Sequence, residues 1–574
     1  MPYDIIIGRN ESDKKLFGKK GLAYLGKSYV TMGNYTSLSN PIYLDVARSH
    51  VILVAGKRGC LVGDTLVFTD KGYKKIKDFD EKEDKVLSFN KEKKEFEWEN
   101  AGLLEYDVEE DLIEIILNND KKLILTKEHP LLVSDNAELR WVETEKLKVN
   151  DTIVGYDDNK TSLVDVEGIL IKKFKGKVYD LSVNKNHSFI ANGIISHNSG
   201  KSYTLGAIAE ALSDLDSETS QNICPLIFDT MGIFWTMKFK NEKDKELLEE
   251  WGLKAKNVPV SVFSPFGYFQ EYRDAGIPVD KEFAIKISQL EAGDWVDLFE
   301  LDFTDPVAVV IENSISKLRK LGGFGFEDIR VEVTNMENTS LENKNSAIAL
   351  FNAAETWKVF DEVKGTAIRD LVVAGTTTVI DLSMYASVGS FNVRGLIIGL
   401  VCKKLFEERM NSRRNEEIQA VSHGLDYMHY KTKRDMPLVW VMIDECHEFL
   451  PREGKTPASD VLVQLLREGR QPGISMVMAT QQPGKIHTDA MTQSDIVLSH
   501  RVTAKPDVEA LNEIMQSYLY ESINAKLNAL PRLKGSAIIL DDNSERIYPC
   551  RIRPRFTWHG GEAPTTVKAE REDL

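Results

Sequence analysis

Four short segments of the chain carry the hydrophobic pattern of an α/β protein. Residues 49–55, 438–443 and 474–479 are mostly apolar runs. Runs of this length predict strands that are buried on both faces, as in a parallel sheet. Residues 202–212 place apolar side chains at helical spacing directly after a glycine-rich stretch. The pattern predicts an α/β domain that contains a strand, a loop and a helix in that order.

A different pattern fills the segment 60–198. Residues 112–117, 123–126 and 178–183 are short alternating or apolar runs, and polar turns such as 118–120 separate them. Short strands joined by polar turns are typical of an all-β unit. We therefore expect an all-β domain inserted between the predicted strand at 49–55 and the predicted helix at 202–212.

Composition and charge limit the classes of function. The chain has 574 residues, of which 42% are hydrophobic, so it can form several packed domains. It shows no long uncharged apolar stretch and no secretion signal at its start, and we expect a soluble cytoplasmic protein without membrane contact. The five scattered cysteines argue against a disulfide framework and a zinc site. The net charge is −16, so contacts with nucleic acid must come from local basic patches.

Two half-motifs flank the segment 60–198. Removing its 139 residues joins the preceding G-K-R-G to the following S-G-K-S, which gives G-x-x-x-x-G-K-S, the P-loop pattern that binds nucleotide phosphates. Lys201 is expected to reach the β- and γ-phosphate oxygens of ATP, and Ser202 to bind Mg²⁺. The predicted nucleotide-binding residues are Gly56, Lys57, Arg58, Gly59, Ser199, Gly200, Lys201 and Ser202.

Polar residues follow two of the predicted strands. Asp444 and Glu445 come directly after 438–443, and Gln481 comes after 474–479. Ligands bind at the carboxyl ends of strands in parallel sheets. We expect Asp444 to organise the Mg²⁺ shell, Glu445 to polarise the attacking water and Gln481 to sense the γ-phosphate.

The ends of the segment 60–198 carry groups that can rearrange peptide bonds. Cys60 places a thiol at the first junction, and Ser199 places a hydroxyl just beyond the second. Asn198 has a side-chain amide that can attack its own carbonyl carbon. These nucleophiles stand where the excision of the segment requires them.

With these residues, the segment resembles an intein of the Hedgehog/intein type. The resemblance rests on Cys60 with Asp64-Thr65, on the TKEH stretch at 126–129, and on VYDLSVNKNHSFIANGIISHN at 178–198. It implies a horseshoe-like β fold and self-splicing that needs no cofactor. The segment is too short for a homing endonuclease domain and contains no LAGLIDADG-like stretch, so we interpret it as a mini-intein.

The resemblance implies an ordered reaction. Cys60 attacks the Gly59 carbonyl to give a thioester, and Ser199 then takes over the acyl group. Asn198 cyclises and cuts its bond to Ser199, and an oxygen-to-nitrogen acyl shift leaves a Gly59–Ser199 peptide bond.

Five further residues receive roles in this reaction by family position. Thr126 and His129 are expected to strain the first scissile amide, and Asp180 to tune Cys60. His187 and His197 are expected to assist cyclisation of the asparagine. Each role is proton transfer or oxyanion stabilisation.

The remaining 435 residues resemble the HerA/FtsK group of P-loop motors, nearest the HerA-type DNA-translocating ATPases. The resemblance rests on SHVILVAGKRG with SGKS, VIDLSMY with VMIDECHEF, LLREGRQPGISMVMATQQP and RIRPRFTWHGGEAP. It implies a RecA-like domain over 51–59 and 199–574, a homo-hexameric ring, DNA threaded through the pore and a partner recombination nuclease.

Three features depart from that family. Residues 1–50 are short for the family's N-terminal barrel, and their β-like runs at 4–8 and 21–32 lead us to expect a partial barrel. Residues 228–232 read FDTMG where the family often has a D-P-H-G-like turn, and Cys446 replaces an alanine. A helical insertion is expected at about 240–364, with polar surface loops such as VTNMENTSLENKNS.

Ring ATPases present a cation to the neighbour's γ-phosphate, and the candidates here are Arg467, Arg470 and Arg501. Basic groups that could contact DNA are Lys403-Lys404, Arg413-Arg414, the run from Lys431 to Arg434, and Arg551, Arg553 and Arg555, whose spacing would place them on one strand face.

Three interpretations of the host part remain open from the sequence. The first is an ATP-driven DNA translocase or helicase that acts in end processing. The second is a related conjugation or packaging motor, and the third is a nucleotide-gated scaffold. The full set of Lys201, Ser202, Asp444, Glu445 and Gln481 argues against the scaffold. Under the first interpretation, ATPase activity is expected to require splicing.

Overall fold

The fold was analysed in a computed structural model of the chain. It describes residues 3–32, 35–56, 61–80, 83–90, 95–118, 121–126, 129–135, 138–144, 147–157, 160–183, 188–197, 201–337, 339–387, 392–423, 434–500, 509–511, 530, 531, 533 and 535–559. In this part of the chain, no helix is both long and apolar enough to cross a membrane.

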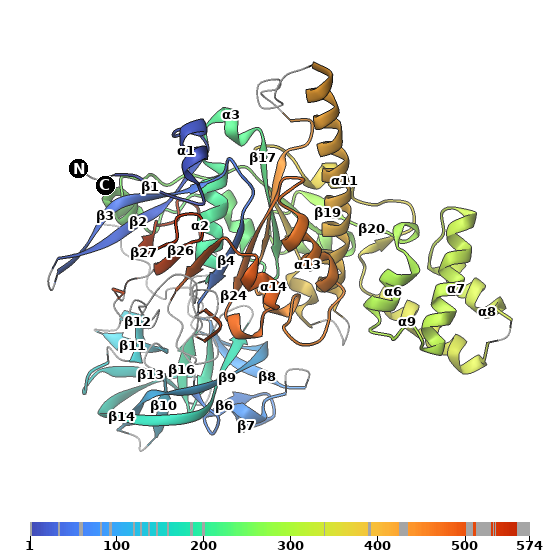
Figure 1. Ribbon diagram of the computed structural model, residues 1–574. Coiled ribbons are helices and arrows are strands. Elements are labelled where there is room, and N and C mark those ends of the chain that lie inside the picture. The colour runs from blue at the N-terminus through green and yellow to red at the C-terminus, as the bar shows by residue number, and fades with distance from the viewer. Residues whose placement is uncertain are drawn as a thin grey trace.

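One large sheet organises the host part of the chain (Figure 1). The described strands follow the spatial order β1-β3-β2-β27-β26-β25-β4-β24-β23-β17-β22-β18-β19. Their bounds are β1 Ile5–Ile7, β2 Leu22–Met32, β3 Tyr35–Asp45, β4 Val51–Ala55, β17 Ile223–Asp229, β18 Val260–Pro265, β19 Lys281–Phe283, β22 Thr377–Asp381, β23 Leu438–Ile443, β24 Ile474–Thr480, β25 Ile496–Ser499, β26 Ser536–Asp541 and β27 Arg546–Ile552.

The strands from β25 to β19 are parallel. Both faces of this part are buried, because Val51 and Leu53 pack into one apolar core while Ile52 and Val54 pack into another. Helix α2 (Lys201–Ser213) contributes to the second core, whereas α11 (Val393–His423) and α13 (Ser459–Glu468) contribute to the first. The α/β class with a mainly parallel sheet is confirmed, as are the strand before the inserted segment, the helix after it and the strands predicted at 438–443 and 474–479.

The N-terminal strands join the central sheet. β2 pairs antiparallel with β27 and with β3, and β3 pairs parallel with β1. These strands therefore extend the central sheet from its antiparallel edge. The partial barrel expected for residues 1–50 stays a prediction.

The segment between β4 and α2 folds as a separate all-β unit, seen in the lower half of Figure 1. It contains its own apolar core, which includes Leu61, Leu125, Leu181 and Phe189. Its described strands are β5 Leu61–Val62, β6 Leu66–Thr69, β7 Gly72–Lys75, β8 Lys85–Asn90, β9 Glu95–Leu117, β10 Lys122–Leu125, β11 Pro130–Asp135, β12 Glu138–Glu143, β13 Thr152–Asp157, β14 Lys160–Val183, β15 Ser188–Ala191 and β16 Ile194–His197. The predicted all-β character is confirmed.

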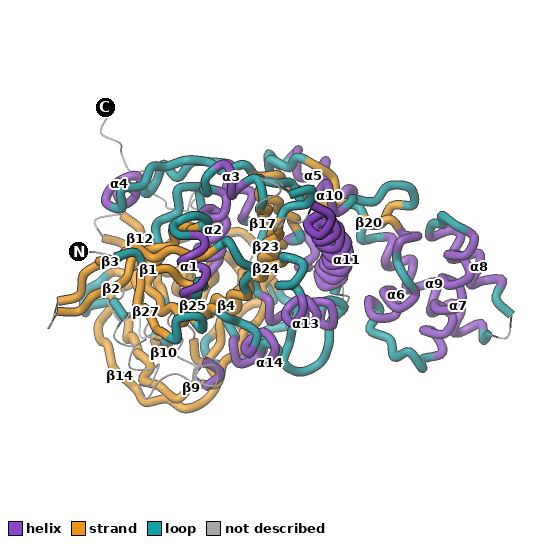
Figure 2. Tube along the Cα trace, turned by 45° about the horizontal axis from the view of Figure 1, so that its top comes forward, coloured by secondary structure: helices purple, strands orange, loops and turns teal. Residues whose placement is uncertain are grey.

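The expected helical insertion is narrower than 240–364. Strands β18 and β19 lie in that range but belong to the central sheet, so the helical part is the module that projects from the body of the protein in Figures 1 and 2. This module packs around the fully buried Trp295. Its helices are α6 Ala292–Leu298, α7 Pro306–Leu321, α8 Phe326–Asn335 and α9 Leu341–Glu355.

The polar run 333–346 does not form surface loops over most of its length. It ends α8 and begins α9, and Ser340 caps α9 by accepting a hydrogen bond from the Asn343 N–H at 3.2 Å. The run is polar because these helix faces are solvated, a pattern that composition alone does not separate from a loop.

Candidate functional site

The host part gathers its catalytic candidates at the carboxyl ends of three neighbouring strands. Asp444 follows β23, Gln481 follows β24 and Gly56 follows β4, and the Gly56 N–H donates to the Thr480 carbonyl at 3.3 Å. β24 lies between the other two strands. The sheet order therefore brings together residues that are more than 400 positions apart in the chain.

Glu445 and Gln481 form a direct contact. The Gln481 Nε2 donates to Glu445 Oε1 at 2.6 Å, and both side chains are buried. Glu445 lies in the left-handed region at φ 49°, a conformation that is costly for a residue with a side chain and concentrates at functional sites. Asp444 is also buried, and its Oδ1 accepts from the Glu445 N–H at 2.9 Å.

This arrangement fits a bound nucleotide and its metal ion. Gln481 Oε1 is buried and has no hydrogen-bond partner within the described residues, although buried polar atoms are normally satisfied. A carboxylate, a second carboxylate and an amide oxygen form the hard oxygen set that Mg²⁺ and its waters prefer. The residues present are therefore compatible with ATP and Mg²⁺.

Most of the predicted phosphate loop lies outside the described residues. Lys201 and Ser202 begin helix α2, but their side chains fall outside what is described. The following predicted site residues lie outside the described residues: Lys57, Arg58, Gly59, Cys60, His187, Asn198, Ser199, Gly200 and Arg501.

The β unit brings three splicing candidates to its own N-terminal end. Leu61 pairs with Leu125 of β10 and with Tyr179 of β14. Thr126 and Asp180 are the next residues after those two partners, so the strand register places both beside the start of the segment. Both are buried, and Asp180 Oδ1 accepts from the Leu181 N–H at 2.9 Å.

His129 is fully buried next to this group. Its N–H donates to the Thr126 carbonyl at 3.2 Å, and its own carbonyl accepts from the Thr144 hydroxyl at 2.7 Å. These bonds fix the turn that follows β10. His197 ends β16, and the pairing of Leu131 with Ser196 brings that strand end back to the His129 turn.

Two predicted DNA contacts are wrong. Arg553 and Arg555 are almost fully buried and bind Glu210 of helix α2, with Arg553 Nη1 and Arg555 Nε each 2.9 Å from its carboxylate. A buried guanidinium is retained where a carboxylate compensates its charge. The expected shared strand face is also wrong, because β27 ends at Ile552 and both arginines follow it. Arg551 is partly exposed and lies 5.8 Å from the ring of Trp251.

The other basic candidates take part in ion pairs or hydrogen bonds. Arg467 contacts Asp489 at 2.7 Å, and Lys403 contacts Glu291 at 3.2 Å. Lys404 donates to Gln289 at 2.5 Å. Arg414 is exposed on α11 and Arg434 contacts Glu416, whereas residues 431–433 lie outside the described residues.

Sequence reasoning missed a pair of buried carboxyl groups at the same sheet edge. Asp229 ends β17 and Asp381 ends β22, and the two residues are register partners. Burial raises the pKa of both, and Asp381 raises that of Asp229 further. The VIDLSMY and FDTMG stretches contain these residues, but only the strand pairing shows that they face each other.

Comparison with known protein families assigns two parts of the chain. Residues 66–201 match the Pretoxin HINT domain, and residues 386–509 match Zonular occludens toxin (Zot). The first range covers most of the separate β unit. The second covers α11, β23, β24 and the carboxyl ends that carry Asp444 and Gln481.

Two curated relatives resemble the host part. A probable DNA double-strand break repair helicase HerA of Methanocaldococcus jannaschii is 22% identical over 217 residues, which cover 34% of this chain and 41% of the relative. The HerA helicase of Pyrococcus furiosus is 24% identical over 139 residues, covering 23% and 25%. The chain spans between 10% and 41% of the length of the curated relatives it matches.

Among solved structures, a DnaB intein from Synechocystis sp. is similar to 25% of this chain. The match covers 99% of that intein, with 23% sequence identity and a TM-score of 0.23.

Proposed function

This chain joins an intein-like HINT domain to a HerA-like P-loop ATPase, and we propose that it is a self-splicing precursor of an ATP-driven DNA translocase or helicase. Residues 60–198 would leave as a mini-intein, and residues 51–59 with 199–574 would form the ATPase domain. The observation that carries the proposal is the position of the HINT domain between strand β4 and helix α2. A P-loop needs these two elements joined by one short phosphate-binding turn.

The splicing chemistry follows from the junction residues. The Cys60 thiolate attacks the Gly59 carbonyl carbon, and the Gly59–Cys60 amide bond is replaced by a thioester. The Ser199 hydroxyl then displaces the thiolate. The side-chain amide nitrogen of Asn198 attacks the backbone carbonyl carbon of Asn198, and this step releases the Ser199 amine. That amine then displaces the Ser199 side-chain oxygen from the ester to Gly59, which leaves a Gly59–Ser199 peptide bond. No external reactant is consumed.

The buried residues of the HINT domain support this order of events. Thr126, His129 and Asp180 lie around the residue that follows the first nucleophile. A hydroxyl, an imidazole and a carboxyl in that position can donate to the scissile carbonyl oxygen and accept the thiol proton. We assign His187 and His197 to the asparagine cyclisation step.

The ATPase assignment rests on the second group of residues. Glu445 would orient the attacking water, and Gln481 would hold the Glu445 carboxylate through their 2.6 Å contact. Asp444 and Ser202 would hold Mg²⁺ when ATP is bound, and Mg²⁺ would neutralise charge that develops on the phosphate oxygens. Among the arginine finger candidates we retain Arg501, because Arg467 contacts Asp489.

We further propose that DNA is the substrate of movement, that the spliced chain forms a homo-hexamer in the cytoplasm, and that it works with a recombination nuclease. The HerA relatives are named as DNA double-strand break repair helicases, and this naming supports the DNA assignment. Ring closure would supply the finger residue from the neighbouring subunit.

A splicing-blocked chain tests the proposal directly. The wild type and the Cys60→Ala/Asn198→Ala double variant are expressed, their intact masses are measured, and ATP hydrolysis is followed with and without DNA. We expect the wild type to yield 435- and 139-residue products and DNA-stimulated hydrolysis, and the double variant to stay at 574 residues without hydrolysis. A Cys224→Ala variant is the matched control, because Cys224 is buried in β17 and does not belong to the segment 60–198. Equal hydrolysis by the unspliced variant would contradict the proposal.

A further inference from the structure

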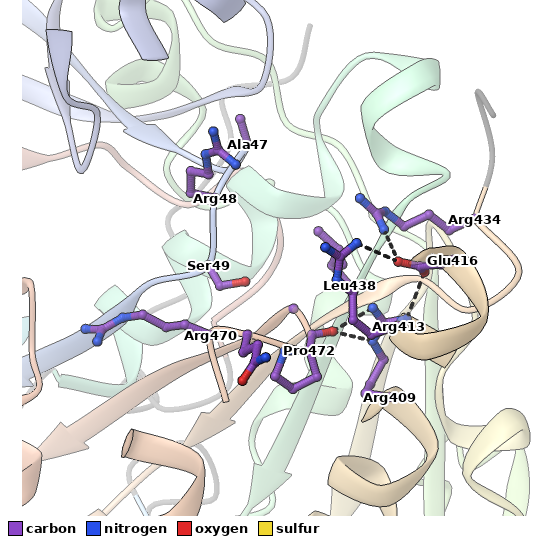
Figure 3. A pocket seen from close by; sticks show the side chains of 12 residues that line it. Ala47, Arg48, Ser49, Arg409, Arg413, Glu416, Arg434, Leu438, Arg470 and Pro472 are labelled. Carbon is purple, nitrogen blue, oxygen red and sulfur yellow. Dashed lines mark hydrogen bonds and ion pairs between the residues drawn. The ribbon is translucent and has the colours of Figure 1, made fainter. Parts of the chain in front are cut away.

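A basic cavity lies at the amino ends of central strands of the large sheet (Figure 3), whereas the candidate nucleotide site lies at their carboxyl ends. Its volume is about 340 Å³. The charged residues that line it are Arg48, Arg409, Arg413, Arg434, Arg470 and Glu416. Five guanidinium groups and one carboxylate therefore meet in one cavity of a chain whose net charge is −16.

The cavity covers the amino ends of three neighbouring strands. Ser49 precedes β4, Leu438 begins β23 and Gly473 precedes β24, and all three line the cavity. The carboxyl ends of the same strands carry the nucleotide site. Because these strands have five to seven residues, a rise of about 3.3 Å per residue puts the cavity roughly 17–23 Å from that site. The cavity is therefore separate from the nucleotide site.

A buried arginine fixes the inner wall of the cavity. Arg409 is fully buried, and its Nε and Nη2 donate to the Pro472 carbonyl at 2.9 and 2.6 Å, while Nη1 donates to the Met436 carbonyl at 2.9 Å. Glu416 accepts from Arg434 at 2.9 Å and lies 3.8 Å from Arg413. These contacts hold α11 against the loops before β23 and β24, and they keep neighbouring guanidinium groups close despite their repulsion.

The rim carries three arginines that solvent reaches. The side chains of Arg48, Arg470 and Arg413 are 51%, 37% and 35% exposed. Each contacts one carboxylate beyond the lining, at 2.9, 3.4 and 2.9 Å respectively. A guanidinium has five N–H donors, and the contacts of these three with described residues occupy only part of them. The rim is thus held in place and still able to donate.

We propose that this cavity binds a phosphate group of the DNA backbone. The proposal deepens the proposed function and rests on its DNA assignment. Several arginines in one concave site favour phosphate, because the planar guanidinium donates two parallel N–H bonds to a phosphate group. The cavity also unites two basic regions of the sequence, around Arg413 and Arg434, with Arg48 and Arg470. A DNA phosphate bound at the amino ends of β4, β23 and β24 would contact the same strands whose carboxyl ends carry the proposed ATP site.

The test compares two neighbouring arginines of α11. The full 574-residue chain is expressed as wild type, as Arg48→Gln/Arg413→Gln and as Arg414→Gln, and each purified product binds fluorescein-labelled duplex DNA over a series of salt concentrations. Arg414 is exposed, lies next to Arg413 and does not line the cavity, so it controls for loss of charge. We expect about tenfold weaker binding for the double variant, with a salt dependence shallower by about two ions, and little change for Arg414→Gln. Melting curves of all variants control for folding. The Arg48→Lys/Arg413→Lys variant conserves the charge and is expected to keep the wild-type salt slope.

The alternative outcomes separate the two proposals. If the wild type binds DNA and the double variant binds it equally well, the cavity proposal is overturned while the proposed function stands. If the wild type binds no DNA at low salt, the DNA assignment itself fails, and the cavity proposal fails with it. Competition with the labelled DNA identifies the ligand. If inorganic phosphate, ATP or a poly-glutamate peptide of matched charge displaces it as effectively as unlabelled DNA does, the cavity is assigned to a free anion, a nucleotide or an acidic protein segment, respectively. Any of these results would overturn the backbone assignment.

Discussion

Replacing Glu210 by glutamine is expected to release the C-terminal strand region from the P-loop helix. Glu210 is fully buried on α2, and Arg553 and Arg555 each donate to it at 2.9 Å. The Phe556 and Thr557 N–H groups donate at 3.1 and 3.2 Å, and the Thr557 hydroxyl also donates. One carboxylate therefore joins α2 to residues more than 340 positions later in the chain.

The size of the effect follows from burial. Glu210→Gln keeps the volume but removes the charge, so two guanidinium groups with 1% and 0% exposure lose their compensating charge. Breaking a buried ion pair by removing one partner costs about 3–5 kcal/mol. Burial by itself raises the pKa of Glu210, but the charges of Arg555 and Arg553 lower it by more, so the pKa lies below its usual value of 4.5. The stabilisation is therefore present above pH 4.5 and lost as pH falls through the lower folded value.

Hydrogen–deuterium exchange measures this effect locally, which suits a chain of several domains. At 1.4 kcal/mol per tenfold, a loss of about 3–5 kcal/mol corresponds to exchange that is about 10²- to 4 × 10³-fold faster in residues 546–559 and in α2. Glu218→Gln is the control, because Glu218 is exposed and its ion pair with Lys20 spans 3.6 Å. This substitution should change the exchange rates little. Acceleration below about fivefold for Glu210→Gln, or equal acceleration in the control, would refute the reasoning.

Three further predictions concern other buried groups. Glu445→Gln should slow ATP hydrolysis by about 10²-fold or more in steady-state assays while nucleotide binding persists; unchanged turnover would remove Glu445 from the proposed base role. Burial lowers the pKa of His50, but its hydrogen bonds to two carboxylates outweigh this and raise the pKa to about 9. That contribution to stability is complete below pH 6.5 and lost as pH rises through 9, so wild type and His50→Gln should differ more in melting temperature at pH 6.5 than at pH 9.5; a constant difference would contradict it. Burial raises the pKa of Asp381 and of Asp229, so the charged form of each is disfavoured in the folded state relative to the unfolded chain. Asp381→Asn should therefore keep or raise the melting temperature at pH 7.5, and a drop of several degrees would show that the ionised pair stabilises the fold.

Several structural features were predictable because their signals are local. The strands at 438–443 and 474–479 each combine an apolar run with a polar residue directly after it, and parallel order then placed Asp444 and Gln481 at one edge. The all-β character of 60–198 was visible for the same reason. The residues to which we assign the two proposed reactions were predicted from short motifs, and their roles stay predictions.

The errors have a common physical origin. Arg553 and Arg555 have the spacing of a basic strand face, but they lie after the end of β27 and pack on Glu210. Residues 22–32 form β2, but the local pattern did not show that β2 pairs with β27, which lies more than 500 positions later. In each case the local pattern did not show the partner, since the partner lies hundreds of residues away.

The sequence by itself predicts where the P-loop pattern is divided and which nucleophiles flank the inserted segment, because both patterns are defined by adjacent covalent neighbours. Only the tertiary structure decided which charged residues are internal. It buried Arg553 and Arg555 on α2, paired Asp229 with Asp381, and gathered Arg48, Arg413 and Arg470 around one cavity. Burial and charge compensation depend on strand order and on long-range packing, and these arise only when the whole sheet has formed.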